Sequence, residues 1–248
     1  MKIASTTFIR LVATLPLFAV GLLAPSAPAR AAEAGQWHYD ISLNLFMAGL
    51  SGNLAAHGVP VDVDAGFDDI VSNLEFSAAG RLTASRDRWV LSTELSYLGA
   101  GGEGTLAKAD LKQWLVEPTV GYQFSDAFTG FAGVRYQSVK TDVRGKGPLG
   151  LNTGQTQDWF DPIVGFTVKM PLGAKWTFDG RFDVGGFGVG SDLTWQIFPY
   201  FNCRLNDRTS LQLGWRWLAT DYEDGSGTSL FRYDVMLQGP QAGITFSF

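Results

Sequence analysis

The feature that most constrains the fold is an alternation of apolar and polar residues with a period of two, which starts at Trp37 and recurs to the C-terminus. In the first segment, Trp37, Tyr39, Ile41 and Leu43 alternate with polar residues. Successive side chains of a β-strand point to opposite faces, so each such segment has an apolar face and a polar face. The pattern predicts an all-β chain.

Ten segments with this pattern can be drawn, and the connections between them alternate in length. They lie at residues 36–49, 75–85, 89–99, 110–124, 128–142, 158–170, 175–186, 192–205, 209–221 and 231–248. Short connections fall at 86–88, 125–127, 171–174 and 206–208, and longer ones at 50–74, 100–109, 143–157, 187–191 and 222–230. Short turns on one side and long loops on the other are typical of outer-membrane barrels. We therefore expect a transmembrane antiparallel up-and-down β-barrel of about ten strands. Eight or twelve remain alternatives, because Val59–Asp64 could form a further hairpin.

Aromatic residues on the apolar faces fall at two levels. Tyr97 follows Trp89 by eight residues, and Tyr136 follows Phe128 by the same interval. A tilted membrane-crossing strand has about 9–11 residues, with aromatic belts at both interfaces, whereas the core of a soluble sandwich has no reason for two levels. The expected membrane-interface aromatics are Trp89, Tyr97, Phe128, Tyr136, Trp176, Trp195 and Trp217.

Composition agrees with strands rather than helices as the membrane-crossing elements. Hydrophobic residues make up 46% of the chain and charged residues 17%, and the mean hydropathy of +0.05 is too low for a bundle of membrane helices. After residue 31, no apolar run approaches the roughly 18 residues expected of a spanning helix. In lipid only helices and closed barrels satisfy their backbone groups, which leaves the barrel.

The N-terminus has the three parts of a secretory signal peptide. Lys2 and Arg10 flank the start of an apolar run at 11–23, and Ala29-Arg30-Ala31 is an A-x-A cleavage site. We expect a signal peptide at 1–31 and a barrel domain at 32–248. The mature chain then has 16 basic and 24 acidic residues, a formal charge of −8, which predicts no nucleic-acid partner.

The alternation also predicts which charged side chains point into the barrel. Seven of them share a middle layer of the lumen: Arg81, Glu94, Glu117, Arg135, Arg181, Asp183 and Arg216. A barrel of this strand count is little wider than its own side chains, and buried charges must be paired or hydrated. The layer is therefore either an ion-pair network that fills the interior or a constriction that selects permeants by charge.

Candidates for catalysis or metal binding are few. His38 lies two residues from Asp40 on one face and could orient a base, although a hydrated polar contact is the simpler interpretation. His57 lies near Asp62, Asp64, Asp68 and Asp69, which could bind a divalent cation or form a solvated loop. We expect no catalytic residues, no metal and no cofactor. Residues 67, 70, 71 and 74 have a helical spacing, so Phe67–Leu74 could form a short helix that caps or plugs the lumen, or equally an irregular loop.

Several motifs resemble those of a broad, largely uncharacterised group of proteobacterial barrels. They are Trp159-Phe160-Asp161-Pro162, Asp183-Val184-Gly185-Gly186-Phe187-Gly188 with Ser191-Asp192, Gly214-Trp215-Arg216-Trp217-Leu218 with Asp221-Tyr222, and Phe67-Asp68-Asp69-Ile70. The end of the chain, Gly243-Ile244-Thr245-Phe246-Ser247-Phe248, resembles the C-terminal signature of Gram-negative outer-membrane proteins. That resemblance implies an assembly signal at Phe246 and Phe248 that the barrel-assembly machinery reads. It implies no catalytic signature.

Together these patterns predict an integral outer-membrane protein with a structural or narrow-pore role, exported through its signal peptide. The expected partners are outer-membrane lipids, the assembly machinery and a small solute or ion, with the barrel as a monomer. One alternative is an interaction or adhesion protein that uses the loops at 51–74, 143–157 and 222–230. The other, less favoured, is an enzyme that acts on envelope lipid or peptide.

Overall fold

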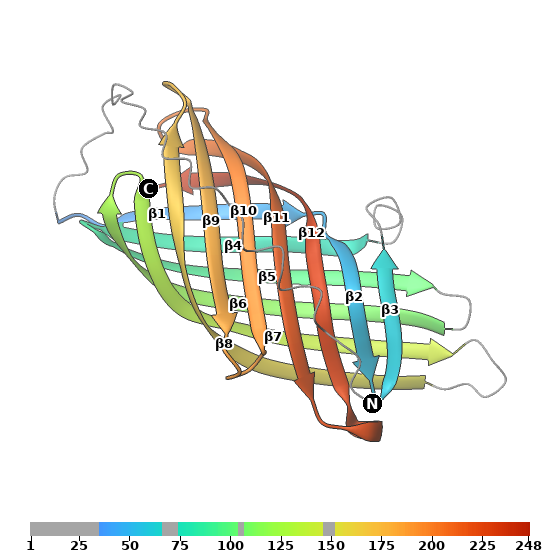
Figure 1. The fold of residues 1–248 in the computed structure, drawn as a ribbon. Helices are drawn as coiled ribbons and strands as arrows, with labels where there is room; N and C mark the ends of the chain where they lie inside the picture. Colours follow the sequence, from blue (N-terminus) through green and yellow to red (C-terminus); the bar gives the residue numbers. More distant parts are fainter. Residues whose placement is uncertain (1–34, 66–73, 104–106, 146–151) are drawn as a thin grey trace, which may run out of the picture. The chain divides into compact units, whose positions relative to one another are not determined.

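The computed structural model describes residues 35–65, 74–103, 107–145 and 152–248. The signal peptide expected at 1–31 lies outside the described residues. Twelve strands and one 3-10 helix, η2, make up the described part (Figure 1). They are β1 (His38–Phe46), β2 (Gly49–Ala56), β3 (Val59–Ala65), β4 (Leu74–Arg86), β5 (Trp89–Glu103), β6 (Ala107–Ser125), β7 (Phe128–Gly145), β8 (Asn152–Pro171), β9 (Trp176–Gly186), β10 (Leu193–Arg204), β11 (Thr209–Asp224), η2 (Gly227–Ser229) and β12 (Phe231–Ser247).

Within the described residues, ten of these strands form a closed antiparallel barrel. From β4 to β12 each strand pairs with the next one in sequence, and β1 pairs with β4 on one side and β12 on the other. In this closing pair, Ile41 lies opposite Phe246. Closure removes the free edges that an open sheet would expose. The predicted fold class, an antiparallel barrel of ten strands, is confirmed.

The hairpin β2–β3 is an addition to the barrel wall. β1 pairs with β12 as far as the pair Phe46–Gln241. β2 then pairs with the next part of β12, from Gly49–Gln238 to Ala55–Arg232. β3 then pairs with β2 alone. The hairpin considered at Val59–Asp64 is therefore present. The short helix considered at Phe67–Leu74 lies outside the described residues up to position 73, and Leu74 begins β4.

Two of the long connections, at 100–109 and 143–157, are much shorter than the sequence pattern predicted. β6, β7 and β8 have 19, 18 and 20 residues, which exceeds the roughly 9–11 that cross a membrane. Ladder pairs continue as far as Glu103–Lys108, Arg144–Asn152 and Asp224–Phe231. The assignment of 100–109 and 143–157 as loops was thus mostly wrong, whereas at 222–230 only the first three residues belong to a strand. Strands continue beyond the point where outward apolar residues end, as at Lys140 and Asp142 of β7.

A reversal of the apolar face is clearest along β12. Toward its start, Phe231 and Tyr233 point inward and are buried, while Arg232 and Asp234 point outward and are exposed. Toward its end the inward residue is Gln241, fully buried, and the outward ones include Ile244. The strand keeps one register throughout, so the reversal lies in the residues and not in the backbone. We use the name distal half for the part of the barrel in which the apolar residues point inward.

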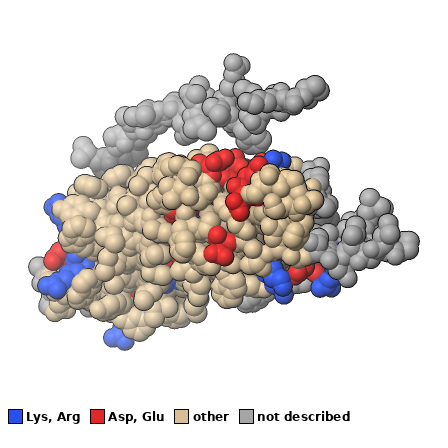
Figure 2. All heavy atoms as spheres, turned by 90° about the horizontal axis from the view of Figure 1, so that it is seen from below, with Lys and Arg blue, Asp and Glu red and all other residues tan. Residues whose placement is uncertain are grey.

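The rest of the barrel has its apolar residues outside. Exposed Leu, Val, Ile and Phe side chains cover its outer wall. Figure 2 shows a mostly uncharged face of the molecule, with Asp and Glu gathered near its middle and Lys and Arg mostly toward its ends. Aromatic rings border this apolar band. We call the belt beside the short turns the lower belt and the one beside the distal half the upper belt. In the lower belt Trp89 contacts Tyr122 at 5.3 Å between ring centroids, and in the upper belt Tyr97 contacts Trp114 at 4.8 Å. The barrel therefore has a banded exterior and a distal half that packs like a soluble protein.

Candidate functional site

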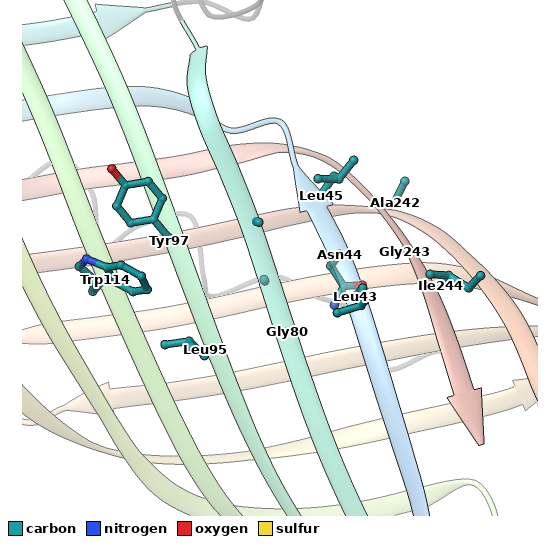
Figure 3. A pocket seen from close by; sticks show the side chains of 12 residues that line it. Leu43, Asn44, Leu45, Gly80, Leu95, Tyr97, Trp114, Ala242, Gly243 and Ile244 are labelled. Atoms are coloured by element: carbon teal, nitrogen blue, oxygen red, sulfur yellow. The ribbon is translucent and has the colours of Figure 1, made fainter. Parts of the chain in front are cut away.

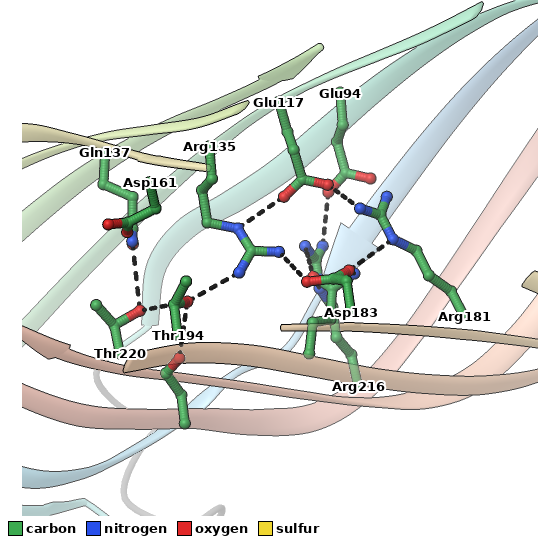
Figure 4. A network of polar contacts seen from close by, with 12 residues as sticks. Glu94, Glu117, Arg135, Gln137, Asp161, Arg181, Asp183, Thr194, Arg216 and Thr220 are labelled. Atoms are coloured by element: carbon green, nitrogen blue, oxygen red, sulfur yellow. Dashed lines mark hydrogen bonds and ion pairs between the residues drawn. The ribbon is translucent and has the colours of Figure 1, made fainter. Parts of the chain in front are cut away.

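The seven charged residues expected in the lumen come from six strands and meet in one network (Figure 4). The alternation of each strand turns them inward, and the ladder registers bring them to a common level; Arg81, for example, lies opposite Glu94 in the β4–β5 ladder. The side chains of the layer are between 0% and 17% exposed. The set comprises Arg81, Glu94, Glu117, Arg135, Arg181, Asp183 and Arg216.

Arg135 on β7 is the hub of one side of the network. Its Nε lies 2.8 Å from Glu117 Oε2, and one terminal nitrogen lies 2.6 Å from Asp183 Oδ1. Arg181 closes a ring, because its Nε lies 2.9 Å from Asp183 Oδ2 and its Nη2 contacts Glu117 Oε1. Each carboxylate of this ring thus accepts hydrogen bonds from both arginines. The Arg181 guanidinium also lies 4.8 Å from the ring centroid of Phe131.

Glu94 on β5 joins the other two arginines. Arg216 donates from Nη1 to Glu94 Oε1 at 2.8 Å, and Arg81 donates from Nε to Glu94 Oε2 at 3.0 Å. Gln196 connects the two sides, since its Oε1 accepts from Arg216 Nε at 3.0 Å and its Nε2 donates to Asp183 at 3.4 Å. The layer is therefore one continuous set of charge-assisted hydrogen bonds across the lumen.

Uncharged polar residues extend the network, and sequence reasoning did not assign them. Arg135 Nη1 donates to Thr194 Oγ1 at 2.8 Å, and Gln137 Nε2 donates to Thr220 Oγ1 at 3.3 Å. Gln113 in turn donates to Gln137 at 2.8 Å and accepts from Tyr233 Oη at 2.9 Å. The alternation places these residues on the inner face too. It would have identified them if inward amides and hydroxyls had been considered together with inward charges.

Asp161 of the Trp-Phe-Asp-Pro motif has a separate role at the β9–β10 turn. It is fully buried. Its Oδ1 accepts from the backbone N–H of Ser191 at 2.6 Å, and its Oδ2 accepts from Trp159 Nε1 at 3.0 Å. The motif therefore ties β8 to this turn.

Above the charged layer, the lumen of the distal half is filled by apolar side chains. Trp159 stacks on Tyr222 with 4.0 Å between ring centroids and an interplanar angle of 10°. This stack joins β8 to β11 beyond the ends of β9 and β10, and Gln157 Nε2 adds a hydrogen bond of 2.9 Å to Tyr222 Oη. The cluster consists of Phe46, Ala48, Leu50, Leu54, Leu98, Leu111, Leu115, Val139, Trp159, Leu218, Tyr222, Phe231, Tyr233, Val235 and Leu237.

Little space is left between the charged layer and the apolar cluster. A cavity of about 20 Å³, lined by residues that include Phe46, Gln113 and Arg216, lies between them. That is room for about one water molecule. In the part of the chain that the structure describes, the lumen is thus occupied at two successive levels. Such an arrangement suits a rigid, filled barrel better than an aqueous channel.

The seven aromatics expected at the membrane interfaces all lie on the outer face of their strands. Trp89, Phe128 and Trp176 start β5, β7 and β9 at the lower belt. In the upper belt Tyr136 contacts Phe160 at 4.8 Å, and Trp217 Nε1 donates to Gln238 Oε1 at 3.0 Å. Trp195 lies on the outer face of β10, opposite Ala219.

The C-terminal pair expected as an assembly signal lies beside β1. Phe246 pairs with Ile41 and Thr209 in the two ladders of β12. Phe248 is 71% exposed, and its backbone N–H donates to Tyr39 O at 2.9 Å. Both residues therefore belong to the seam that closes the barrel.

The remaining candidates are dispersed. Asp40 accepts a hydrogen bond from the Ser247 hydroxyl at 2.5 Å, while His38 lies opposite Ser85. His57 lies at the β2–β3 turn, where its Nε2 is 3.3 Å from Gly154 O, and Asp68 and Asp69 fall outside the described residues. No group of three or more His, Cys, Asp or Glu residues among those described could hold a metal ion. No helix in the described ranges is long and apolar enough to span a membrane.

Comparisons with known proteins add similarity of fold at low identity. No family model matches the sequence, and no curated protein matches it significantly. Among solved structures, the chain is similar to Ail, the attachment invasion locus protein of Yersinia pestis, with 10% identity, coverage of 86% of this chain and 99% of that one, and a TM-score of 0.43. The chain is also similar to the Ralstonia pickettii toluene transporter TbuX, with 10% identity, coverage of 87% of this chain and 90% of that one, and a TM-score of 0.41. For Neisserial surface protein A the identity is 9%, the coverage is 87% of this chain and 100% of that one, and the TM-score is 0.37.

Proposed function

We propose that the protein is an integral outer-membrane protein whose barrel is structural and does not conduct ions. The observation that carries this proposal is the filled lumen. Arg135, Glu117 and Asp183 are fully or almost fully buried in mutual ion pairs, and the apolar cluster of the distal half lies directly beyond them. A conducting pore, whether selective for cations or for anions, would need hydrated charged side chains along an open path.

The exterior supports the membrane setting. An apolar band between two aromatic belts is the outer surface that a transmembrane barrel presents to lipid. The secretory signal and the C-terminal pattern favour the outer membrane as its place. Polar outward residues begin beyond the upper belt, with Lys140, Asp142 and Arg144 following Tyr136 and Ser138 on β7. The distal half would therefore project from the membrane.

Conductance in planar bilayers tests the proposal directly. Folding of the refolded wild-type protein is checked by its heat-modifiable mobility in gels. In KCl at about 1 M, where the Debye length is only about 3 Å, the protein is expected to give no discrete openings. Silence is expected because no hydrated path crosses the charged layer. Steady openings with an ion preference would overturn the proposal and make the layer a selectivity filter.

A matched pair of variants on β7 tests where the membrane ends. Val134→Arg places a charge in the apolar band, and we expect it to reduce the free energy of folding into bilayers by roughly 2–4 kcal/mol. Ser138→Arg, four residues farther along the same outer face and beyond Tyr136, should cost at most about 1 kcal/mol. Urea titrations in lipid vesicles measure both. Equal effects would place the band elsewhere.

The distal half also favours a second candidate function, interaction at the cell surface. It is a folded platform and not a set of free loops: His57 N–H donates to Gln155 Oε1 at 3.0 Å, and Gly58 N–H donates to Leu230 O at 3.0 Å, so the hairpin tip is bound to both β8 and the β11–β12 turn. A rigid surface binds with less loss of conformational entropy than a mobile loop. Attachment of cells that produce the protein, compared with cells producing a charge-neutralised Lys140→Gln, Arg144→Gln, Arg232→Gln variant, would distinguish this role.

A further inference from the structure

The outer wall of the barrel contains a groove that the filled lumen does not explain (Figure 3). Its volume is about 910 Å³ and its lining is almost entirely apolar, a size typical of small-molecule sites. It extends over β12, β1, β4, β5 and β6, which is about 19 Å across at the usual strand spacing. It lies in the apolar band just below Tyr97 and Trp114 of the upper belt.

The groove has a physical origin in small side chains and a strand divergence. Its floor carries Ala78 and Gly80 on β4 and Ala242 on β12, with Leu43 and Leu45 beside them. In the described ladders β1 leaves β4 after Asn44–Ala79, and above that point β4 pairs with β5 alone. A Cβ atom added at Gly80 would meet nothing within 4 Å, so the floor is open to an occupant.

A cationic pair lies next to the rim of the groove. Lys112 and Lys140 are directly opposite each other in the β6–β7 ladder and are both exposed on the outer face. Lys112 precedes Trp114 of the groove by two residues on β6, about 7 Å along the strand. Lys140 Nζ lies 3.3 Å from Asp142 Oδ2. Like charges opposite each other on paired strands destabilise a sheet. Asp110 and Asp142 lie opposite each other two residues beyond the lysines and offset part of their charge, and an anion bound between the lysines would offset the rest.

We propose that this groove binds a phosphate-bearing lipid from the leaflet next to the distal half. One acyl chain would lie over Gly80, and the phosphate would lie between Lys112 and Lys140, just above the upper belt. The concave shape favours a flexible chain over the convex wall of a second barrel. The inference rests on the membrane-spanning function proposed above.

Native mass spectrometry of protein released from nanodiscs of equimolar phosphatidylglycerol and phosphatidylcholine tests the proposal. The wild-type protein should retain one phosphatidylglycerol. Gly80→Leu and Ala78→Leu, which fill the groove, should each reduce that occupancy at least about five-fold, because the acyl chain and the new side chain compete for one volume. Ala219→Leu is the control, since Ala219 lies on the outer face of β11, opposite Trp195, and outside the groove. It should retain wild-type occupancy.

The double variant Lys112→Gln, Lys140→Gln tests the headgroup. It should lose the preference for phosphatidylglycerol over phosphatidylcholine while still inserting into bilayers. Equal retention of both lipids by the wild-type protein, unchanged occupancy in Gly80→Leu and Ala78→Leu, or a second copy of the chain in place of lipid would each overturn the inference. A folded, silent barrel that retains no lipid refutes only this inference, whereas a chain that does not insert into bilayers refutes the proposed function.

Discussion

Replacement of Arg135 by Ala is expected to lower the free energy of unfolding of the barrel by about 3–5 kcal/mol, the usual cost of removing one partner from a buried ion pair. Arg135 is fully buried, and it lies within 2.8 Å of both Glu117 and Asp183. Its loss leaves two buried carboxylates with Arg181 as their shared cationic partner, while Gln196 still donates to Asp183. Equilibrium unfolding in urea, followed by tryptophan fluorescence in lipid vesicles, gives the difference.

A surface arginine provides the control for this prediction. Arg204 is exposed, and its guanidinium donates to Ala174 O at a short turn, so Arg204→Ala should change the free energy of unfolding by less than about 0.5 kcal/mol. The double variant Arg135→Ala, Glu117→Gln should be less unstable than the sum of the single variants, because the neutral amide leaves no unpaired charge. An Arg135→Ala barrel with unchanged stability and unchanged conductance would contradict the charged-layer interpretation.

Replacement of Trp159 by Ala should lower the free energy of unfolding by about 3–5 kcal/mol, as large-to-small changes of a buried aromatic do. Trp159 is 4% exposed and stacks on Tyr222. It also holds Asp161 through its Nε1. The change leaves a cavity in the apolar cluster. In the described residues this cluster connects β8 with β11, which do not pair with each other through backbone hydrogen bonds. Unfolding in urea and resistance of the distal half to protease measure the effect.

Trp159→Phe separates packing from hydrogen bonding at this position. It keeps an aromatic ring against Tyr222 and loses the donor to Asp161, which should cost about 1–3 kcal/mol. A Trp159→Ala variant as stable as Trp159→Phe would mean that the stack contributes little. The distal half would then behave as a set of loops, as the sequence interpretation of 143–157 had it.

Much of the architecture and of the charged layer could be predicted from the chain because both depend on a local property. A period of two places Glu94, Glu117 and Arg135 on the inner faces of their strands whatever the neighbouring strands are. The same rule failed as a guide to the ends of β7 and β8. There the apolar residues change to the inner face, as at Val139, and a search for outward apolar residues ends the strand too early.

The amino-acid sequence by itself determined the strand-forming segments, the face to which each side chain points and the two aromatic levels. Only the tertiary structure decided which residues meet, because register and closure join strands that are far apart in sequence. Gln196 lies between Arg216 and Asp183, Lys112 lies opposite Lys140, and Gly80 lies beneath an open groove. None of these relations follows from alternation, since each depends on the spacing and divergence of strands paired around the barrel.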